Sequence, residues 1–249
     1  MSVASSRAQS LSPRKRPTRA SKTHLTQAGC YVSEQCVLEG TIVLERGCVL
    51  HPKAVIIVAP TCTVTFGPGC VVEENAVLHF PGPGNATVGQ GNAFQVGCAV
   101  DLVPDVVPPS SPPLPAADGT VPPPTSSGVV PSIGEWNTFA PRSRVKSVRV
   151  GDWCTFGPGT ALRPDHPQLE VEDAGSRRWK AVPSQSVVYG ATSRIRHWDG
   201  SGKEHELGVR RSATEFLREI MPKQQKRDTR PPPPASTPQA QQAPPQAQT

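Results

Sequence analysis

Cysteine and histidine are the residues of this 249-residue chain whose types could support chemistry, and there are seven and six of them. Thiolates and imidazoles bind zinc when they cluster, and an imidazole can act as a general base. The cysteines do not cluster, because six of the seven are spread along the chain at one repeating position: Cys30, Cys36, Cys48, Cys70, Cys98 and Cys154. We therefore predict buried structural thiols at these positions. Cys62 falls outside the repeat and is expected to be the more exposed thiol.

The histidines do not form the groups that metal chemistry requires. His51 and His79 each follow a core position and are expected on outer turns, whereas His166, His197 and His205 fall in loop and tail segments. A zinc-hydroxide site of the carbonic-anhydrase type needs three converging histidines. A single histidine as the general base of an acyl transfer stays open for His51 or His79. We expect no catalytic, metal-binding or cofactor-binding residue, and interpret both as exposed turn histidines.

The segments that position these residues repeat with a period of six. An apolar residue recurs at every sixth position and is followed, near the next corner, by glycine or another small residue. Each hexapeptide is then a short strand with a tight turn, and three of them make one coil of a triangular prism. The predicted core includes Leu38, Leu44, Leu50, Ile56, Phe66, Phe94, Phe139 and Phe156.

Departures from the period fall after every third hexapeptide, so every break lies at the same corner of the prism. We therefore predict an all-β fold, a left-handed parallel β-helix of about six coils, with a C-terminal α-helix and disordered ends. The left hand is taken from the hexapeptide class, because the general crossover rule favours the right hand.

Composition divides the chain into a body and its flanks. Residues 1–24 carry basic side chains and no acid, and are expected to be a disordered arm. Residues 25–193 form the β-helix, with a proline-rich loop inserted at 101–132. Residues 194–227 are expected to be a helical segment packed on the prism, and 228–249 a disordered Pro/Gln tail.

Helical spacing predicts an amphipathic helix that begins near Thr214. Phe216, Leu217 and Ile220 share one face of it, and Pro222 is expected to end or kink it. We expect this face to pack along the prism, with binding of a partner as the alternative.

Charge and hydropathy exclude several classes of protein. The basic arm accounts for the net charge of +6, so the acidic body is not expected to bind nucleic acid. The sequence has no apolar run long enough to span a bilayer and no secretory signal, so we expect no membrane insertion and free thiols in a reducing compartment. Ser111 and Thr237 each precede a proline and are candidates for phosphorylation.

Five stretches of the chain resemble the family of the smaller left-handed β-helix subunit of dynactin, dynactin subunit six. They are LHPKAVI at 50–56, FGPGCVVEENAVL at 66–78, VGQGNAFQVGC at 88–98, VVYGA at 187–191 and FLREIMP at 216–222. The long insertion, the basic arm and the Pro/Gln tail depart from that family.

This resemblance implies a non-catalytic structural subunit of the dynactin pointed-end complex, which supports dynein-driven microtubule transport. Its partners would be the second β-helix subunit of dynactin, other pointed-end subunits and the actin-related filament, with dynein adaptors engaged indirectly. The implied location is cytoplasmic and cytoskeleton-associated, and a homotrimer is not expected. The alternative is a trimeric hexapeptide-repeat enzyme, an acyltransferase or a carbonic-anhydrase-like protein, with its sites between identical prisms.

Overall fold

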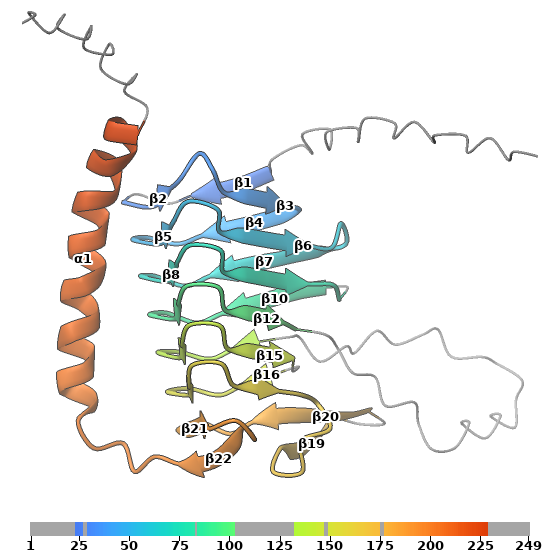
Figure 1. The fold of residues 1–249 in the computed structure, drawn as a ribbon. Coiled ribbons are helices and arrows are strands. Elements are labelled where there is room, and N and C mark those ends of the chain that lie inside the picture. Colours follow the sequence, from blue (N-terminus) through green and yellow to red (C-terminus); the bar gives the residue numbers. More distant parts are fainter. Residues whose placement is uncertain are drawn as a thin grey trace, which may run out of the picture.

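Short strands stack into three parallel sheets around one core in this computed structural model (Figure 1). The structure describes residues 23–26, 29–82, 84–102, 132–146, 149–174 and 177–228. The chain passes from sheet A to sheet B to sheet C in each coil, and sheet C contains six strands, one for each complete coil. The predicted left-handed parallel β-helix with a C-terminal α-helix is confirmed.

The strands of each sheet lie in chain order along the prism. Sheet A contains β1 (Thr23–Thr26), β4 (Thr41–Leu44), β7 (Cys62–Phe66), β10 (Gly84–Val88), β13 (Ser132–Ile133), β16 (Arg149–Val150), β20 (Arg177–Val182) and β19 (Glu170–Ala174). Sheet B contains β2 (Tyr31–Val32), β5 (Val49–Leu50), β8 (Val71–Val72), β11 (Ala93–Phe94), β14 (Thr138–Phe139), β17 (Thr155–Phe156), β21 (Ser186–Tyr189) and β22 (Arg194–His197). Sheet C contains β3 (Val37–Glu39), β6 (Val55–Val58), β9 (Val77–Phe80), β12 (Ala99–Asp101), β15 (Arg144–Lys146) and β18 (Ala161–Leu162).

The core runs along the prism axis because alternate strand residues point inward. Phe94, Phe139 and Phe156 stack on one another, with ring centroids 4.8 and 4.7 Å apart. These distances match the spacing of about 4.8 Å between neighbouring strands. Burying each ring contributes about 1.5–3 kcal/mol. The other apolar residues singled out in the sequence also lie in this core: Leu38, Leu44, Leu50, Ile56 and Phe66.

Two antiparallel strands close the C-terminal end of the prism. β19 pairs with β20 in sheet A, and β22 pairs with β21 in sheet B. The helical segment expected from residue 194 needs correction, because Arg194–His197 is the strand β22. A solenoid leaves strand edges unpaired at its last coil, and these two strands cover them. At the other end, β1 begins at Thr23, within the segment assigned to the arm.

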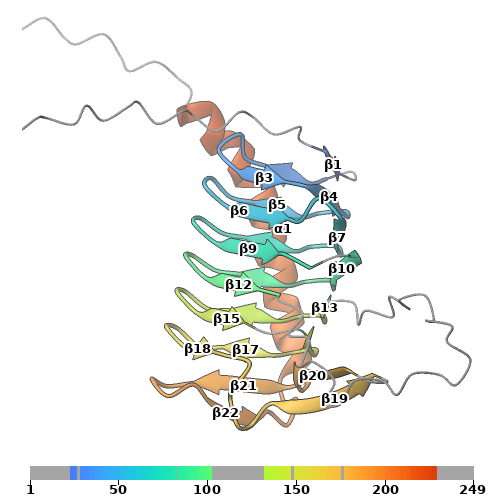
Figure 2. The same cartoon turned by 90° about the vertical axis from the view of Figure 1, so that its right-hand side faces the viewer.

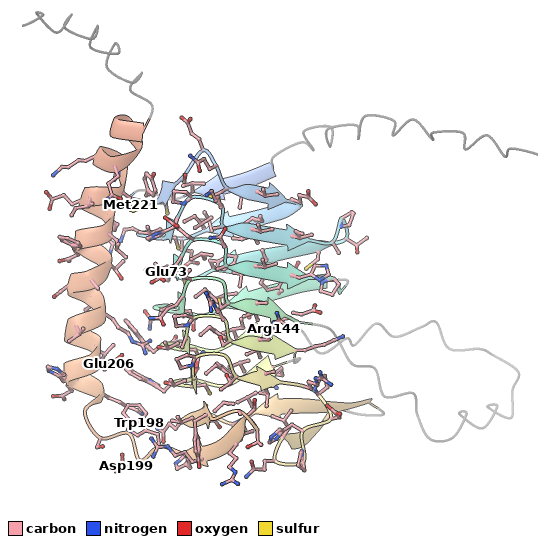
Figure 3. The ribbon with its side chains drawn as sticks, in the orientation of Figure 1. Glu73, Arg144, Trp198, Asp199, Glu206 and Met221 are labelled. Carbon is pink, nitrogen blue, oxygen red and sulfur yellow. The ribbon has the colours of Figure 1, made fainter. Side chains whose placement is uncertain are left out.

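Helix α1 (Lys203–Asp228) runs along sheet B, antiparallel to the direction in which the coils progress (Figure 2). It begins well before Thr214 and continues through Pro222, so both predicted boundaries were wrong. Leu217 and Met221 contact Tyr31, Val49 and Val71 of sheet B (Figure 3). This contact holds the helix on the sheet next to the proline.

The expected packing residues of α1 do not all face the prism. Phe216 is 60% exposed, which corrects the prediction that it packs on sheet B. Ile220 is half-buried and lines a cavity with His51 and Met221. The apolar stripe of the helix is therefore narrower than its sequence suggested, and it is centred on Leu217 and Met221.

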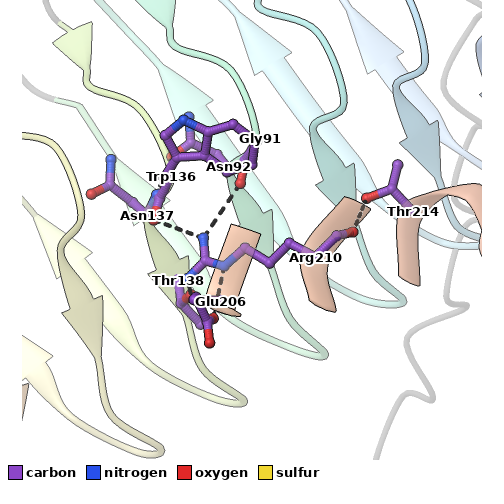
Figure 4. A network of polar contacts seen from close by, with 8 residues as sticks. All are labelled: Gly91, Asn92, Trp136, Asn137, Thr138, Glu206, Arg210 and Thr214. Carbon is purple, nitrogen blue, oxygen red and sulfur yellow. Dashed lines mark hydrogen bonds and ion pairs between the residues drawn. The ribbon is translucent and has the colours of Figure 1, made fainter. Parts of the chain in front are cut away.

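The first half of α1 is attached by polar contacts (Figure 4). Arg210 donates from Nη1 to the Trp136 carbonyl at 2.7 Å, and its Nη2 bonds the Thr138 hydroxyl. Its Nε donates to Glu206 Oε1 at 2.9 Å. A single half-buried guanidinium thus joins the helix to β14 of sheet B and to the turn before it.

Several predictions fall on parts of the chain that lie outside the described residues: the phosphorylation candidates Ser111 and Thr237, most of the 101–132 insertion, and the tail at 229–249. Within the described ranges, no helix has both the length and the apolar character needed to cross a bilayer.

Candidate active site

The cysteines lie inside the prism, where they act as small corner residues. Cys36, Cys48, Cys70, Cys98 and Cys154 are buried, and Cys30 in the first coil is partly buried. Burial raises the pKa of Cys98 and of Cys154 to about 12, so neither is a thiolate nucleophile at neutral pH.

Cys62 corrects our expectation of an exposed thiol. It begins β7, where alternation along the strand turns its side chain inward, and it is 4% exposed. Burial raises its pKa as well. Among the described residues, no group of three His, Cys, Asp or Glu side chains could hold a metal ion.

His51 lies at the turn between sheets B and C, beneath the C-terminal half of α1. It lines a cavity with Glu74, Phe216 and Ile220. Burial lowers its pKa, although Glu74 acts in the opposite direction, and its Nε2 is buried without a hydrogen-bond partner among the described residues. His51 therefore lies on a turn as expected, but it is half-buried beneath the helix, which corrects the expectation that it is exposed.

His79 has a different position from the one expected, because it lies in strand β9 rather than on a turn. Its side chain is on the outer face of sheet C and is 44% exposed. Asp101 is its partner in the register of β12, one coil further on. The His79 Nδ1 and Asp101 Oδ1 atoms are 3.3 Å apart, and this carboxylate oxygen has no hydrogen-bond partner among the described residues. A carboxylate that accepts a hydrogen bond from Nδ1 orients a catalytic imidazole. Asp101 lies close to that position, although the hydrogen bond itself is not formed in this structure.

Sequence reasoning named His79 but missed Asp101. The available signal was their shared phase, since each directly follows the inward residue of a sheet C strand, Leu78 and Val100 respectively. Two residues at the same phase in successive coils lie side by side on one face. The pair therefore forms although its members are far apart in the chain.

An apolar stripe lies next to this pair. Val37, Val55, Val77 and Ala99 are register partners on four successive strands of sheet C. Val37 is 44% exposed and Val77 is 37% exposed. The face of sheet C thus places the His79–Asp101 pair beside a row of small and β-branched apolar side chains, of which Val37 and Val77 are exposed.

Comparison with known proteins yields matches among solved structures alone: no protein-family model matches the chain, and no curated protein does. A hexapeptide transferase family protein from Anaplasma phagocytophilum matches 80% of this chain and 92% of its own, at 10% identity and a TM-score of 0.46. LpxA from Acinetobacter baumannii matches 76% and 83%, at 10% identity and a TM-score of 0.34. The acetyltransferase domain of PglB from Neisseria gonorrhoeae matches 63% and 57%, at 13% identity and a TM-score of 0.31.

These matches correct the expectation of a non-catalytic dynactin subunit. The matched structures named here are a hexapeptide transferase family protein, an acetyltransferase domain and LpxA, and the main expectation is corrected on that finding. At such low identity they show a likeness of fold alone. The assignment of an activity therefore depends on the His79–Asp101 pair itself.

Proposed function

We propose that this protein is a hexapeptide-repeat acyltransferase in which His79 is the general base and Asp101 orients it. The observation that carries the proposal is the pairing of an exposed imidazole with a carboxylate across β9 and β12. The reaction class is transfer of an acyl group from a thioester to a hydroxyl or amine.

The chemistry assigns one role to each member of the pair. As the acceptor oxygen or nitrogen attacks the acyl carbonyl carbon, Nε2 of His79 removes the acceptor proton. A C–O or C–N bond forms, the C–S bond of the thioester breaks, and the leaving thiolate takes the proton from the imidazolium. Asp101 faces Nδ1 and stabilises the imidazolium while it carries the proton.

The apolar stripe supports the same proposal. Val77 and His79 are two residues apart on β9, and Val55 and Ile57 are their register partners on β6. The two valines therefore lie next to His79 on the same face of sheet C. An acyl chain laid along these valines would bring its carbonyl carbon near His79. Each methylene removed from water there contributes about 0.8 kcal/mol, so longer chains should bind more tightly.

The test is release of free thiol from acyl-coenzyme A thioesters of increasing chain length, with UDP-N-acetylglucosamine and simple amino sugars as acceptors. We expect His79→Ala to lower the rate about a hundredfold or more, within the usual contribution of a general base. His205→Ala is the matched control, because His205 is exposed on α1 and should leave the rate unchanged.

Asp101 is a positioning residue, so its test needs a conservative partner. Asp101→Asn should lower the rate by about tenfold or more, and Asp101→Glu should restore part of it. Added imidazole should also rescue His79→Ala, which a purely structural role would not allow. If no acceptor gives thiol release above the His79→Ala background, the proposed function is wrong.

That the chain is homologous to the dynactin subunit six family is a separate proposal, and it rests on the five sequence stretches alone. The partners and the location that it implies likewise stay predictions. Purification of the tagged chain with its bound proteins would test them, and it is independent of the thiol-release assay.

A further inference from the structure

The turn between sheets A and B repeats one backbone conformation in every coil. The third residue of this turn has a positive φ throughout, between 58° and 79°. In the first four coils this residue is glycine, and afterwards it is a residue with a side chain: Gly29, Gly47, Gly69, Gly91, Trp136, Trp153 and Gln185. The same corner is thus bare at one end of the prism and filled with indole rings at the other.

The indole rings stack on one another along this corner, and the stack ends at Gly91. Trp198 and Trp153 have ring centroids 6.0 Å apart, and Trp153 and Trp136 are 5.9 Å apart. Trp136 covers Gly91, because a Cβ there would lie 2.3 Å from a ring carbon. The next position, Gly69, is open, since a Cβ there would meet nothing within 4 Å.

A guanidinium group lies at the other end of the glycine positions. The Arg218 group covers Gly29 and lies 3.7 Å from where a Cβ of Gly47 would be. The order along the corner is therefore three indole rings, an open slot and a planar cation. A flat group in this slot would extend the stack, with Trp136 on one side of it and Arg218 on the other.

Helix α1 covers this slot, and the helix and the prism together enclose a cavity of about 490 Å³. The volume lies within the range of about 300–1,000 Å³ that small-molecule sites occupy. Val71, Ala93 and Leu217 supply apolar walls. The helix spans the cavity, with the Arg210 contacts toward one end of it and the Leu217 and Met221 contacts toward the other.

The charged groups at the cavity favour an anion with a hydrogen-bonding group. Arg46 and Arg218 line it, and neither guanidinium group has a hydrogen bond or ion pair with a described residue, whereas the Arg210 guanidinium is engaged by Glu206. Glu215 also lines the cavity, and Glu73 accepts the Val96 N–H there. Burial raises the pKa of the Glu73 carboxyl.

We propose that this cavity binds a small planar aromatic anion, stacked beside Trp136 over Gly69 and paired through its acidic group with Arg46 and Arg218. The proposed active site lies on sheet C, whereas this cavity lies between sheet B and α1. A failure of one proposal would therefore not affect the other. A ligand here also contacts α1 directly, and it should therefore hold the helix more firmly on the prism.

The test is calorimetric titration of the full chain with naphthalene sulfonate as probe and with naphthalene methanol as its neutral counterpart. We expect the sulfonate to bind about tenfold or more tightly than the alcohol, because a charge-assisted pair with arginine adds at least 1.4 kcal/mol. Replacing both arginines in an Arg46→Gln, Arg218→Gln variant should abolish this difference.

Gly69→Trp tests the slot itself. Trp136 and Trp153 tolerate the same turn position with φ of 58° and 59°, so a tryptophan at position 69 should fold and fill the slot. Binding of the sulfonate should be lost. Gly159→Trp is the matched control, because Gly159 also has a positive φ and open space at its Cβ but lies at the corner between sheets B and C.

Two results would overturn the proposal: no binding of the sulfonate to the unmodified chain at millimolar concentration, or undiminished binding to Gly69→Trp. If Gly69→Trp fails to fold, the double arginine variant replaces it as the test: a preference for the sulfonate that survives Arg46→Gln, Arg218→Gln then overturns the proposal.

Discussion

At the scale of single residues, two buried asparagines hold neighbouring coils together. Asn92 Nδ2 donates to the Gly89 and Gly134 carbonyls at 2.7 and 2.8 Å, and its Oδ1 accepts the Asn137 N–H at 2.9 Å. Asn137 Oδ1 accepts the Cys154 N–H at 2.6 Å, but its Nδ2 has no partner among the described residues. Both side chains are fully buried, so their contributions to stability should differ only through these bonds.

We expect Asn92→Ala to lower the free energy of unfolding by about 2–4 kcal/mol, because it removes three hydrogen bonds and leaves buried backbone groups unpaired. Asn137→Ala removes one bond and should cost about 1 kcal/mol. Urea denaturation of both variants measures the difference. Equal losses would show that packing, and not hydrogen bonding, sets the cost at this corner.

The limits of sequence analysis are visible at the same scale. The core positions of Leu44 and Phe139 could be predicted because a period of six places every inward residue. The burial of Cys62 could not, because it depends on β7 starting earlier than the hexapeptide period requires. Asp101 was missed since its importance arises only from His79, its neighbour in the preceding coil.

At the scale of elements, helix α1 is attached at two separated places. Its first half has few apolar residues facing the prism and relies on Arg210, which also lies 5.9 Å from the Trp153 ring centroid. The polar composition of this half, with Gly208 in its middle, is the reason that helical spacing predicted only the later part. Contact with sheet B supplies the stability that sequence propensity does not show.

We expect Arg210→Ala to release the first half of α1 without unfolding the coils. The variant loses bonds to Trp136 and Thr138, together with a cation–aromatic contact worth about 0.5–2 kcal/mol. Hydrogen exchange of the amides from Glu204 to Thr214 should accelerate about tenfold or more, while the sheets keep their protection. Arg211→Ala, an exposed neighbour, is the control, and equal acceleration in both would contradict this role for Arg210.

At the scale of the whole molecule, the faces of the prism are covered unequally. Helix α1 covers sheet B, whereas sheet C exposes a row of valines beside the His79–Asp101 pair. Exposed apolar rows of this kind mark interaction surfaces. An acyl transfer also gains from exclusion of water around the base, which a single prism with an open face does not provide.

A second copy against sheet C would supply that cover, and three copies would close the ring. The acyltransferase proposal therefore predicts a particle of three chains in light scattering, whereas the resemblance to a dynactin subunit predicted no homotrimer. Val77→Lys should shift the particle to single chains and lower thiol release while His79 is intact. Val96→Lys should change neither, because Val96 is 46% exposed at the corner between sheets B and C. A single-chain particle whose thiol release survives Val77→Lys would mean that His79 works on an open face and that sheet C is not an interface between copies.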